Sequence, residues 1–165
     1  NVSSVYNLPD QYFGEGMAFY KGELFQLTWT SATGFVYNPA TLTLSPPRSF
    51  QYETTKNNEG WGITVYEEKD EFIVTDGSNN LIFWDTNSFE ILRTVPVYRQ
   101  DGRAAVRLNE LEYWRGRVLA NVWKEDVLLV IHPDTGVVEK EYGKNSTCAM
   151  RYSEKGIACT IYSNH

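Results

Sequence analysis

The sequence has few cysteines and histidines, no long apolar run and no excess of basic residues. Its 165 residues include two cysteines and two histidines, too few for a credible zinc site. The formal net charge is −6, and no basic cluster supplies the phosphate contacts that nucleic-acid binding needs. The longest apolar run is a few residues, which excludes a transmembrane helix. We therefore expect no metal, no other cofactor, no nucleic-acid partner and no membrane span.

The first residues also lack the features of a signal peptide. Asn1 opens a polar stretch without a charged region or an apolar region, so either the chain is cytosolic or a leader has been removed. Two triplets, which begin at Asn1 and Asn145, are glycosylation acceptors in the secretory route and favour a secreted glycoprotein. Cys148 and Cys159 are compatible with a disulfide across a hairpin or with two buried free thiols.

Aromatic residues are abundant, and they take part in a repeat. The chain has 11 Tyr, 8 Phe and 5 Trp, side chains that suit half-buried strands. A spacing of 47 residues relates three sets of positions: Asn38, Asp85 and His132; Trp29, Asp76 and Trp123; Glu15, Gly62 and Asn109. A period of about 40–50 residues with several short strands in each unit is the sequence signature of a β-propeller.

Three units share one order of strands and turns, at approximately 16–50, 62–97 and 110–142. A fourth unit, at 148–165, is partial. Gly, Pro, Asn and Asp recur where the turns demand them, and no segment has the 3.6-residue period of a long amphipathic helix. The predicted fold class is all-β. We expect one β-propeller domain over 1–165, built from four-stranded antiparallel blades.

At this period the chain supplies about three and a half blades, whereas closed propellers have about 4–8. An open ring leaves unpaired strand edges. We therefore expect either that residues are missing at one or both ends or that another chain completes the propeller.

The links between the blades carry the unusual residues. Glu15 stands between two glycines before the first blade, Trp61 stands between two glycines before the second, and Asn109 precedes the third. Glycines that flank one large residue let the backbone turn sharply and present that side chain.

At these links the sequence resembles the plant and bacterial type of glutaminyl-peptide cyclotransferase, the glutamine cyclotransferase family. The matching strings, in family order from Tyr12 to about Val138, are YFGEGMAFYKGELFQLTW, GFVYNPATL, GWGITVY, TDGSNNLIFWDTNSFE, RLNELEYWRGRVLANVW and VIHPDTGVV. The resemblance implies a five-bladed propeller whose active site lies at the mouth of the axial channel. It also implies an enzyme that cyclises the N-terminal glutamine of peptides or proteins to pyroglutamate and releases ammonia, without a catalytic metal.

The resemblance carries functional residues onto this chain. The essential glutamate of the family corresponds to Glu15, and its pocket asparagine corresponds to Asn109. Its aromatic pocket residues correspond to Phe13, Trp29, Trp61 and Trp123. The family also has an upstream FTQGL motif and downstream NGIA and GKLWP motifs. None of the three occurs in this sequence, and Ile161 or Tyr162 stands where the family lysine is expected.

The chemistry of these residue types agrees with the family role. One carboxyl group can take a proton from an amine and deliver it to leaving ammonia if an apolar setting lifts its pKa toward neutrality. Tryptophans can wall a pocket, and Asn109 could hold a carbonyl oxygen. The alternatives are a surface glutamate, ordinary propeller core and an asparagine that caps backbone groups.

Neighbouring polar residues are given no catalytic role. Strand alternation cannot point both Asn109 and Glu110 or Glu112 into one pocket. Asp76 is interpreted as a turn residue and His132 as a solvated one.

Two other functions stay open at this point. A catalytically inactive propeller could act as a structural or protein-interaction module through its open strand edges. A sugar-binding propeller could stack saccharides on Trp29 and Trp123.

Overall fold

The computed structural model describes residues 5–41, 47–143, 146–153 and 156–163. The possible glycosylation sites, Asn1 and Asn145, lie outside these residues, and the side chains of Cys148 and Cys159 also lie outside the described part. The glycosylation and disulfide assignments therefore stay predictions.

Three four-stranded antiparallel sheets follow one another along the chain. The first sheet contains β1 (Gly14–Tyr20), β2 (Glu23–Thr28), β3 (Thr33–Tyr37) and β4 (Arg48–Gln51). The second contains β5 (Ile63–Tyr66), β6 (Glu71–Val74), β7 (Asn80–Asp85) and β8 (Ile91–Pro96). The third contains β9 (Leu108–Trp114), β10 (Arg117–Val122), β11 (Val127–Ile131) and β12 (Val138–Gly143). Short 3₁₀ turns occur at η1 (Pro39–Thr41) and η2 (Glu67–Lys69).

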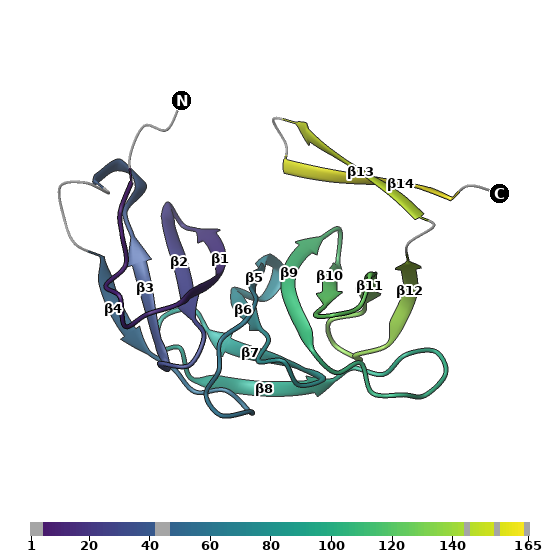
Figure 1. Cartoon of the computed structure of the whole chain (residues 1–165), viewed down its shortest axis with the longest axis horizontal. Helices are drawn as coiled ribbons and strands as arrows, with labels where there is room; N and C mark the ends of the chain where they lie inside the picture. Colours follow the sequence, from purple (N-terminus) through teal and green to yellow (C-terminus); the bar gives the residue numbers. More distant parts are fainter. Residues whose placement is uncertain (1–4, 42–46, 144–145, 154–155, 164–165) are drawn as a thin grey trace.

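The sheets stand side by side in an arc, with the first strand of each toward the centre and the fourth toward the outside (Figure 1). β1 contacts β5, and β5 contacts β9. This is the arrangement of propeller blades, and it confirms the predicted all-β fold class. The predicted blades at 16–50, 62–97 and 110–142 compare with sheets that span 14–51, 63–96 and 108–143.

A two-stranded sheet follows at the end of the chain, formed by β13 (Ser146–Ser153) and β14 (Gly156–Ser163). Its backbone register pairs Cys148 with Ile161 and Cys159 with Met150. The two cysteines thus lie on facing strands of a hairpin, one diagonal step apart instead of directly opposite.

Two hydrophobic clusters fill the spaces between neighbouring sheets, and strand alternation divides the residues of the middle sheet between them. Phe72 and Val74 of β6 belong to the cluster shared with the first sheet, whereas Ile73 between them belongs to the cluster shared with the third. In β7, Trp84 packs in the first cluster and Phe83 in the second. All five side chains are fully buried. The middle sheet is therefore apolar on both faces, as its uninterrupted hydrophobic strands require.

The repeat spacing has a direct structural counterpart at the turns after the third strands. Asn38 Oδ1 accepts the backbone N–H of Ala40 at 2.9 Å, and Asp85 Oδ1 accepts that of Asn87 at 2.9 Å. His132 Nδ1 accepts the N–H of Asp134 at 3.3 Å. Three different side chains thus cap the same turn in successive blades. His132 is half-buried, so it is partly solvated, and it has the additional role of capping the turn.

The links between sheets approach one another closely at the centre. The Gly16 N–H donates to the Trp61 carbonyl oxygen at 2.7 Å. A Cβ atom on Gly62 would lie 2.2 Å from the Asn109 carbonyl oxygen. The Thr75 hydroxyl accepts the Gly62 N–H at 2.9 Å and donates to that Asn109 oxygen at 2.6 Å. The two glycines therefore serve close backbone approach, which no larger residue would permit.

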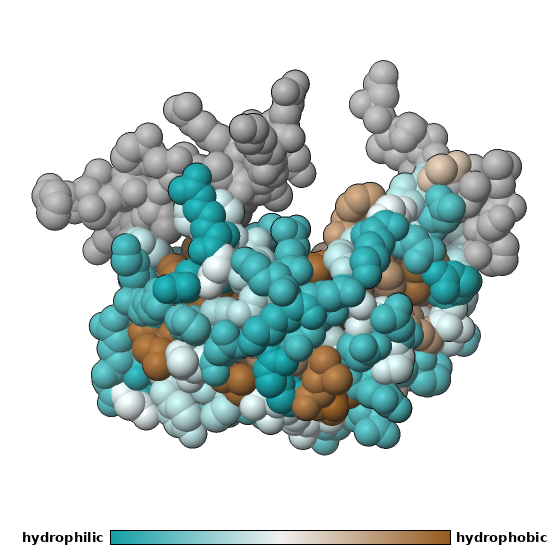
Figure 2. Space-filling model, turned by 180° about the vertical axis from the view of Figure 1, so that it is seen from behind, coloured by the Kyte–Doolittle hydropathy of each residue, from teal (hydrophilic) through white to brown (hydrophobic). Residues whose placement is uncertain are grey.

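The surface is mostly polar on the face that Figure 2 shows, where brown hydrophobic patches are separated by hydrophilic residues. Isolated patches of this kind are ordinary for a folded chain. In the part of the chain that the structure describes, no helix is long and apolar enough to cross a membrane.

Replacing Gly62 with Ala tests the close approach of the links. The added methyl group would overlap the Asn109 carbonyl, so we expect Gly62→Ala to lower the free energy of unfolding by about 1–3 kcal/mol. Chemical denaturation measures this change. Gly143→Ala is the matched control, because its nearest contact, at 3.8 Å, is an ordinary one, and its effect should stay within about 0.5 kcal/mol. Equal stability of the two variants would contradict the close approach.

Candidate active site

Six side chains that the sequence singles out line one hollow of about 250 Å³. They come from all three sheets or from the links between them: Phe13, Glu15, Trp29, Trp61, Asn109 and Trp123. Residues up to 110 positions apart thus surround one small space, with one carboxyl group and one amide among four aromatic rings. The functional roles of these residues are taken up below as proposals.

Glu15 supplies the carboxyl group of the hollow. It lies in β1, one residue before Gly16, whose backbone is bonded to the next link. Its side chain is partly buried, and this burial raises its pKa above the ordinary value of 4.5. Desolvation disfavours the charged form of a carboxyl group, so Glu15 retains its proton to higher pH than an exposed glutamate.

The aromatic walls form two edge-to-face pairs. The ring centroids of Trp61 and Trp123 are 5.6 Å apart at an interplanar angle of 83°, and those of Phe13 and Trp29 are 6.3 Å apart at 70°. Phe13, Trp29 and Trp123 expose 65, 45 and 47% of their surface, which is far more than buried propeller core would show. These rings therefore form an open apolar wall on which a ligand can stack.

Trp61 is held from behind by a turn in the second sheet. Gly77, at φ +73°, lies so close that a Cβ atom there would come within 2.5 Å of the Trp61 ring. Asp76, fully buried, fixes the same turn, because its Oδ1 accepts the Ser78 N–H at 3.0 Å and its Oδ2 accepts the Thr55 hydroxyl at 2.6 Å. Asp76 is thus a turn residue, as the sequence predicts.

Glu59 joins two of the walls. Its Oε2 accepts the indole N–H of Trp29 and that of Trp61, each at 2.9 Å. Burial alone would raise the pKa of Glu59. The hydrogen bonds from Trp61, Trp29 and Asn57, together with the charge of Lys56, outweigh burial and lower the pKa.

Asn109 supplies the amide of the hollow. It lies in β9, and its backbone oxygen accepts the Thr75 hydroxyl, so its position is fixed through the main chain. Within the described residues, no hydrogen bond engages its side-chain amide. The amide is therefore free to meet a ligand instead of capping backbone groups.

The next residues of β9 do not line this hollow. Glu110 is absent from its lining, and the pKa of Glu110 is raised by burial and by the Glu15 carboxylate. Glu112 lines a separate hollow of about 240 Å³ beside β1 and β5, and burial raises its pKa. Both glutamates are thus outside the hollow, but strand alternation is not the reason: the register of β9 with β10 shifts between Leu108 and Leu111, and both leucines are buried in the same cluster.

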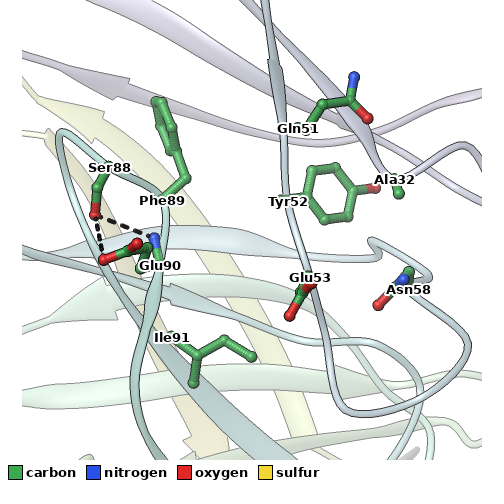
Figure 3. Close-up of a pocket in the computed structure, with 9 residues that line it drawn as sticks. All are labelled: Ala32, Gln51, Tyr52, Glu53, Asn58, Ser88, Phe89, Glu90 and Ile91. Carbon is green, nitrogen blue, oxygen red and sulfur yellow. Dashed lines mark hydrogen bonds between the residues drawn. The ribbon is translucent and has the colours of Figure 1, made fainter.

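A larger hollow of about 610 Å³ lies between the first and second sheets (Figure 3). Two of its polar side chains are bonded to a neighbour or to the main chain. Ser88 Oγ donates to Glu90 Oε2 at 3.5 Å and accepts the Glu90 N–H at 3.3 Å, while the Tyr52 hydroxyl donates to the Thr28 carbonyl. None of the six site residues lines it, so the smaller hollow is the candidate site.

No group of three or more His, Cys, Asp or Glu side chains is placed to hold a metal ion within the residues that the structure describes. The candidate site presents a single carboxyl group and an amide, which are fewer ligands than zinc, calcium or magnesium sites in proteins usually have.

Sequence reasoning missed the supporting residues Glu59, Thr75 and Gly77. Glu59 directly precedes the glycine-flanked Trp61, so its place beside a link residue was an available signal. The hydrogen bonds of Thr75 and the contact between Gly77 and Trp61 depend on how two links meet in space, and no spacing in the sequence reveals that.

Comparisons with known proteins agree with this fold. The glutamine cyclotransferase family model matches residues 1–156. A glutaminyl-peptide cyclotransferase from Arabidopsis thaliana is 31% identical over 135 residues, which is 82% of this chain and 40% of that protein. The crystal structure of glutaminyl cyclase from Myxococcus xanthus matches with a TM-score of 0.72 and 25% identity, covering 91% of this chain and 68% of that chain.

The fold is also shared more widely. The computationally designed protein Ika4 matches with a TM-score of 0.54 at 13% identity, covering 94% of this chain and 93% of that one. At this identity the likeness concerns the fold alone.

The chain spans 40% of the length of the curated relative that it matches. The family match nevertheless extends over nearly the whole chain, from residue 1 to residue 156, and includes all six residues of the hollow. The resemblance inferred from the sequence motifs is thereby confirmed, and the chain belongs to the glutamine cyclotransferase family.

Proposed function

We propose that the intact protein converts the N-terminal glutamine of peptides or proteins to pyroglutamate and releases ammonia. The observation that carries the proposal is the composition of the hollow: one carboxyl group with a raised pKa and one free amide, surrounded by four aromatic rings. Membership of the glutamine cyclotransferase family supports the same reaction.

The reaction is internal to the substrate. The nitrogen of the α-amine attacks the carbon of the γ-carboxamide, a ring C–N bond forms, and the bond to the amide nitrogen breaks. One proton must leave the attacking amine, and one must reach the departing nitrogen before it can leave as ammonia. A group that gives back the proton it has taken meets both needs.

In this proposal Glu15 performs both transfers. As a carboxylate it accepts a proton from the amine, and as a carboxylic acid it returns a proton to the leaving nitrogen. The partial burial that raises its pKa brings the carboxyl group nearer to the pKa of the amine, and this makes transfer in either direction easier.

Asn109 and the aromatic residues complete the proposed roles. The free amide of Asn109 donates to the γ-carbonyl oxygen, where negative charge develops as the ring closes. Phe13, Trp29, Trp61 and Trp123 pack around the glutamine side chain and keep water from hydrolysing it.

The alternative, an inactive propeller that serves as a structural or interaction module completed by another chain, predicts no turnover by the intact protein.

We also propose, from the triplets at Asn1 and Asn145, that the protein enters the secretory route and carries glycans there. Mass analysis of protein from its natural source, before and after glycosidase treatment, tests this second proposal, and an unchanged mass counts against it.

Replacing Glu15 with Gln in the intact protein tests the proton transfer. Glutamine keeps the size of the side chain but neither accepts nor returns the proton, so we expect kcat for a glutaminyl peptide to fall by about 100-fold or more with KM little changed. Ammonia release and pyroglutamate formation are measured together.

Glu112→Gln is the matched control for this substitution. Glu112 also has a pKa raised by burial, but it lies in the neighbouring hollow. Its replacement should leave turnover within about threefold of the unmodified protein. Undiminished turnover by Glu15→Gln would remove Glu15 from the mechanism, and absence of turnover in the unmodified protein would favour the inactive alternative.

The pH dependence of kcat/KM provides a further test. Glu15 acts first as a base, so activity requires its ionised form and falls as pH decreases through its pKa. Because burial raises this pKa, the acid limb should lie above pH 4.5, the ordinary value for glutamate.

The substrate amine titrates as well, with an ordinary pKa near about 7.7–8.0. Peptides whose amines have different pKa values distinguish the two groups in the pH profile of kcat/KM. The limb that Glu15 causes stays at the same pH for every peptide, whereas the limb that the amine causes moves with the pKa of the amine. A fixed limb at or below pH 4.5 would be incompatible with the raised pKa.

A further inference from the structure

One carboxylate oxygen bonds two walls of the hollow that belong to different parts of the fold. Trp29 follows β2 in the first sheet, whereas Trp61 belongs to the link that leads to β5 in the second. Glu59 Oε2 accepts the Nε1–H of both indoles at 2.9 Å. The carboxylate therefore fixes the orientation of the two rings relative to each other.

The segment that carries Glu59 is itself held in place. The Glu59 N–H donates to the Lys56 carbonyl at 3.1 Å, and the Thr54 hydroxyl donates to the Glu59 carbonyl at 3.0 Å. The next residue, Gly60, donates its N–H to the Trp29 carbonyl at 3.0 Å. Both the main chain and the side chain of this segment therefore dock onto Trp29.

The chemistry of the groups makes this a firm arrangement. An indole has a single donor and no acceptor, so a carboxylate satisfies it completely. Hydrogen bonds to an ionised acceptor are about twice as strong as neutral ones. The lowered pKa of Glu59 keeps this acceptor ionised at neutral pH.

We propose that Glu59 is a positioning residue that engages the indole N–H groups of Trp29 and Trp61, so that these walls offer a glutaminyl substrate only ring surface. The inference rests on the proposed function, because it concerns how the γ-carboxamide is oriented in the same hollow.

This arrangement bears on how the amide of the substrate binds. A primary amide has a strong acceptor, and a free indole N–H in the wall would hold its carbonyl oxygen away from Asn109. With both indole donors engaged by Glu59, the carbonyl pairs productively with Asn109, and the nitrogen faces Glu15. Removing Glu59 would create two competing donors and a population of substrate bound in unproductive orientations.

The kinetic test compares three replacements of Glu59 in the intact protein. Glu59→Ala removes the acceptor, and Glu59→Asp shortens the side chain by one methylene so that it cannot reach both indoles. We expect kcat/KM for a glutaminyl peptide to fall about ten- to hundredfold in both. Glu59→Gln keeps an acceptor oxygen at the same distance and should stay within about threefold of the unmodified protein.

Glu53→Ala is the matched control. Glu53 is an exposed glutamate of the same link, and it lines the separate hollow shown in Figure 3. We expect its replacement to leave kcat/KM unchanged.

A spectroscopic readout distinguishes positioning from a general loss of structure. The chain has five tryptophans, and their Nε1–H groups give separate signals in a ¹H–¹⁵N spectrum. We expect the two signals of Trp29 and Trp61 to shift in Glu59→Ala and Glu59→Asp, with those of Trp84 and Trp114, which do not line the hollow, unmoved. Trp29→Phe and Trp61→Phe assign the two signals.

The two readouts can fail separately. If the unmodified protein shows no turnover, the proposed function fails, whereas shifts of these two signals would still support the role of Glu59. If turnover is present and both Glu59→Ala and Glu59→Asp keep kcat/KM within about threefold, the inference is overturned. Unmoved indole signals in Glu59→Asp overturn it as well, and this variant decides the test if Glu59→Ala does not fold.

Discussion

The close contact of the inter-sheet links at the centre of the arc is the constraint on which the rest of the structure depends. Gly16 donates its N–H to the Trp61 carbonyl, and Gly62 lies against the Asn109 carbonyl without room for a Cβ atom. The first contact joins main chain to main chain, and in the second the Thr75 hydroxyl bridges the Gly62 N–H and the Asn109 carbonyl, so together they fix the distance between neighbouring sheets. The apolar clusters between the sheets then fill a space whose width is already set.

The candidate site follows from the same contact. Glu15, Trp61 and Asn109 each lie next to one of the bonded link residues or belong to it, so the backbone contacts bring them together. Trp29 and Trp123 join them because the second strand of a blade returns to the side of the ring where the links run. The carboxyl group, the amide and the aromatic rings are thus gathered by the assembly of the sheets, and no single sheet contains the site.

Much of this arrangement could be predicted from the sequence, for a physical reason. A fixed period places equivalent residues at equivalent points of a ring, so the 47-residue spacing was enough to put Glu15 near Asn109 and Trp29 near Trp123. The family motifs added Phe13 and Trp61. The role of Glu59 could not be predicted, because it depends on two indole N–H groups that point at one oxygen. The sequence does not reveal such side-chain orientations.

The capping role of His132 could not be predicted for a similar reason. A histidine beside a proline in a turn is expected to be solvated. In the structure its Nδ1 also has the capping role that Asn38 and Asp85 have in the other blades. The repeat preserved the acceptor position and not the residue type. The capping function therefore became visible only when the three turns could be compared atom by atom.

Neighbouring sheets are joined mainly by different interactions on the two faces of the arc. On the face of the links, backbone hydrogen bonds and the Glu59 carboxylate hold the sheets, and Arg99 and Arg107 also pair with Glu125. On the opposite face, where the β1–β2 and β5–β6 turns lie, exposed ion pairs join successive sheets, with Lys21 bonded to Asp70 at 3.0 Å and Lys69 bonded to Asp134 at 2.6 Å. Dissolved salt screens exposed pairs, which contribute about 0–1 kcal/mol each, and leaves backbone bonds largely unaffected. A rise in ionic strength therefore weakens the contacts at this rim, while the backbone hydrogen bonds next to Glu15 keep their geometry.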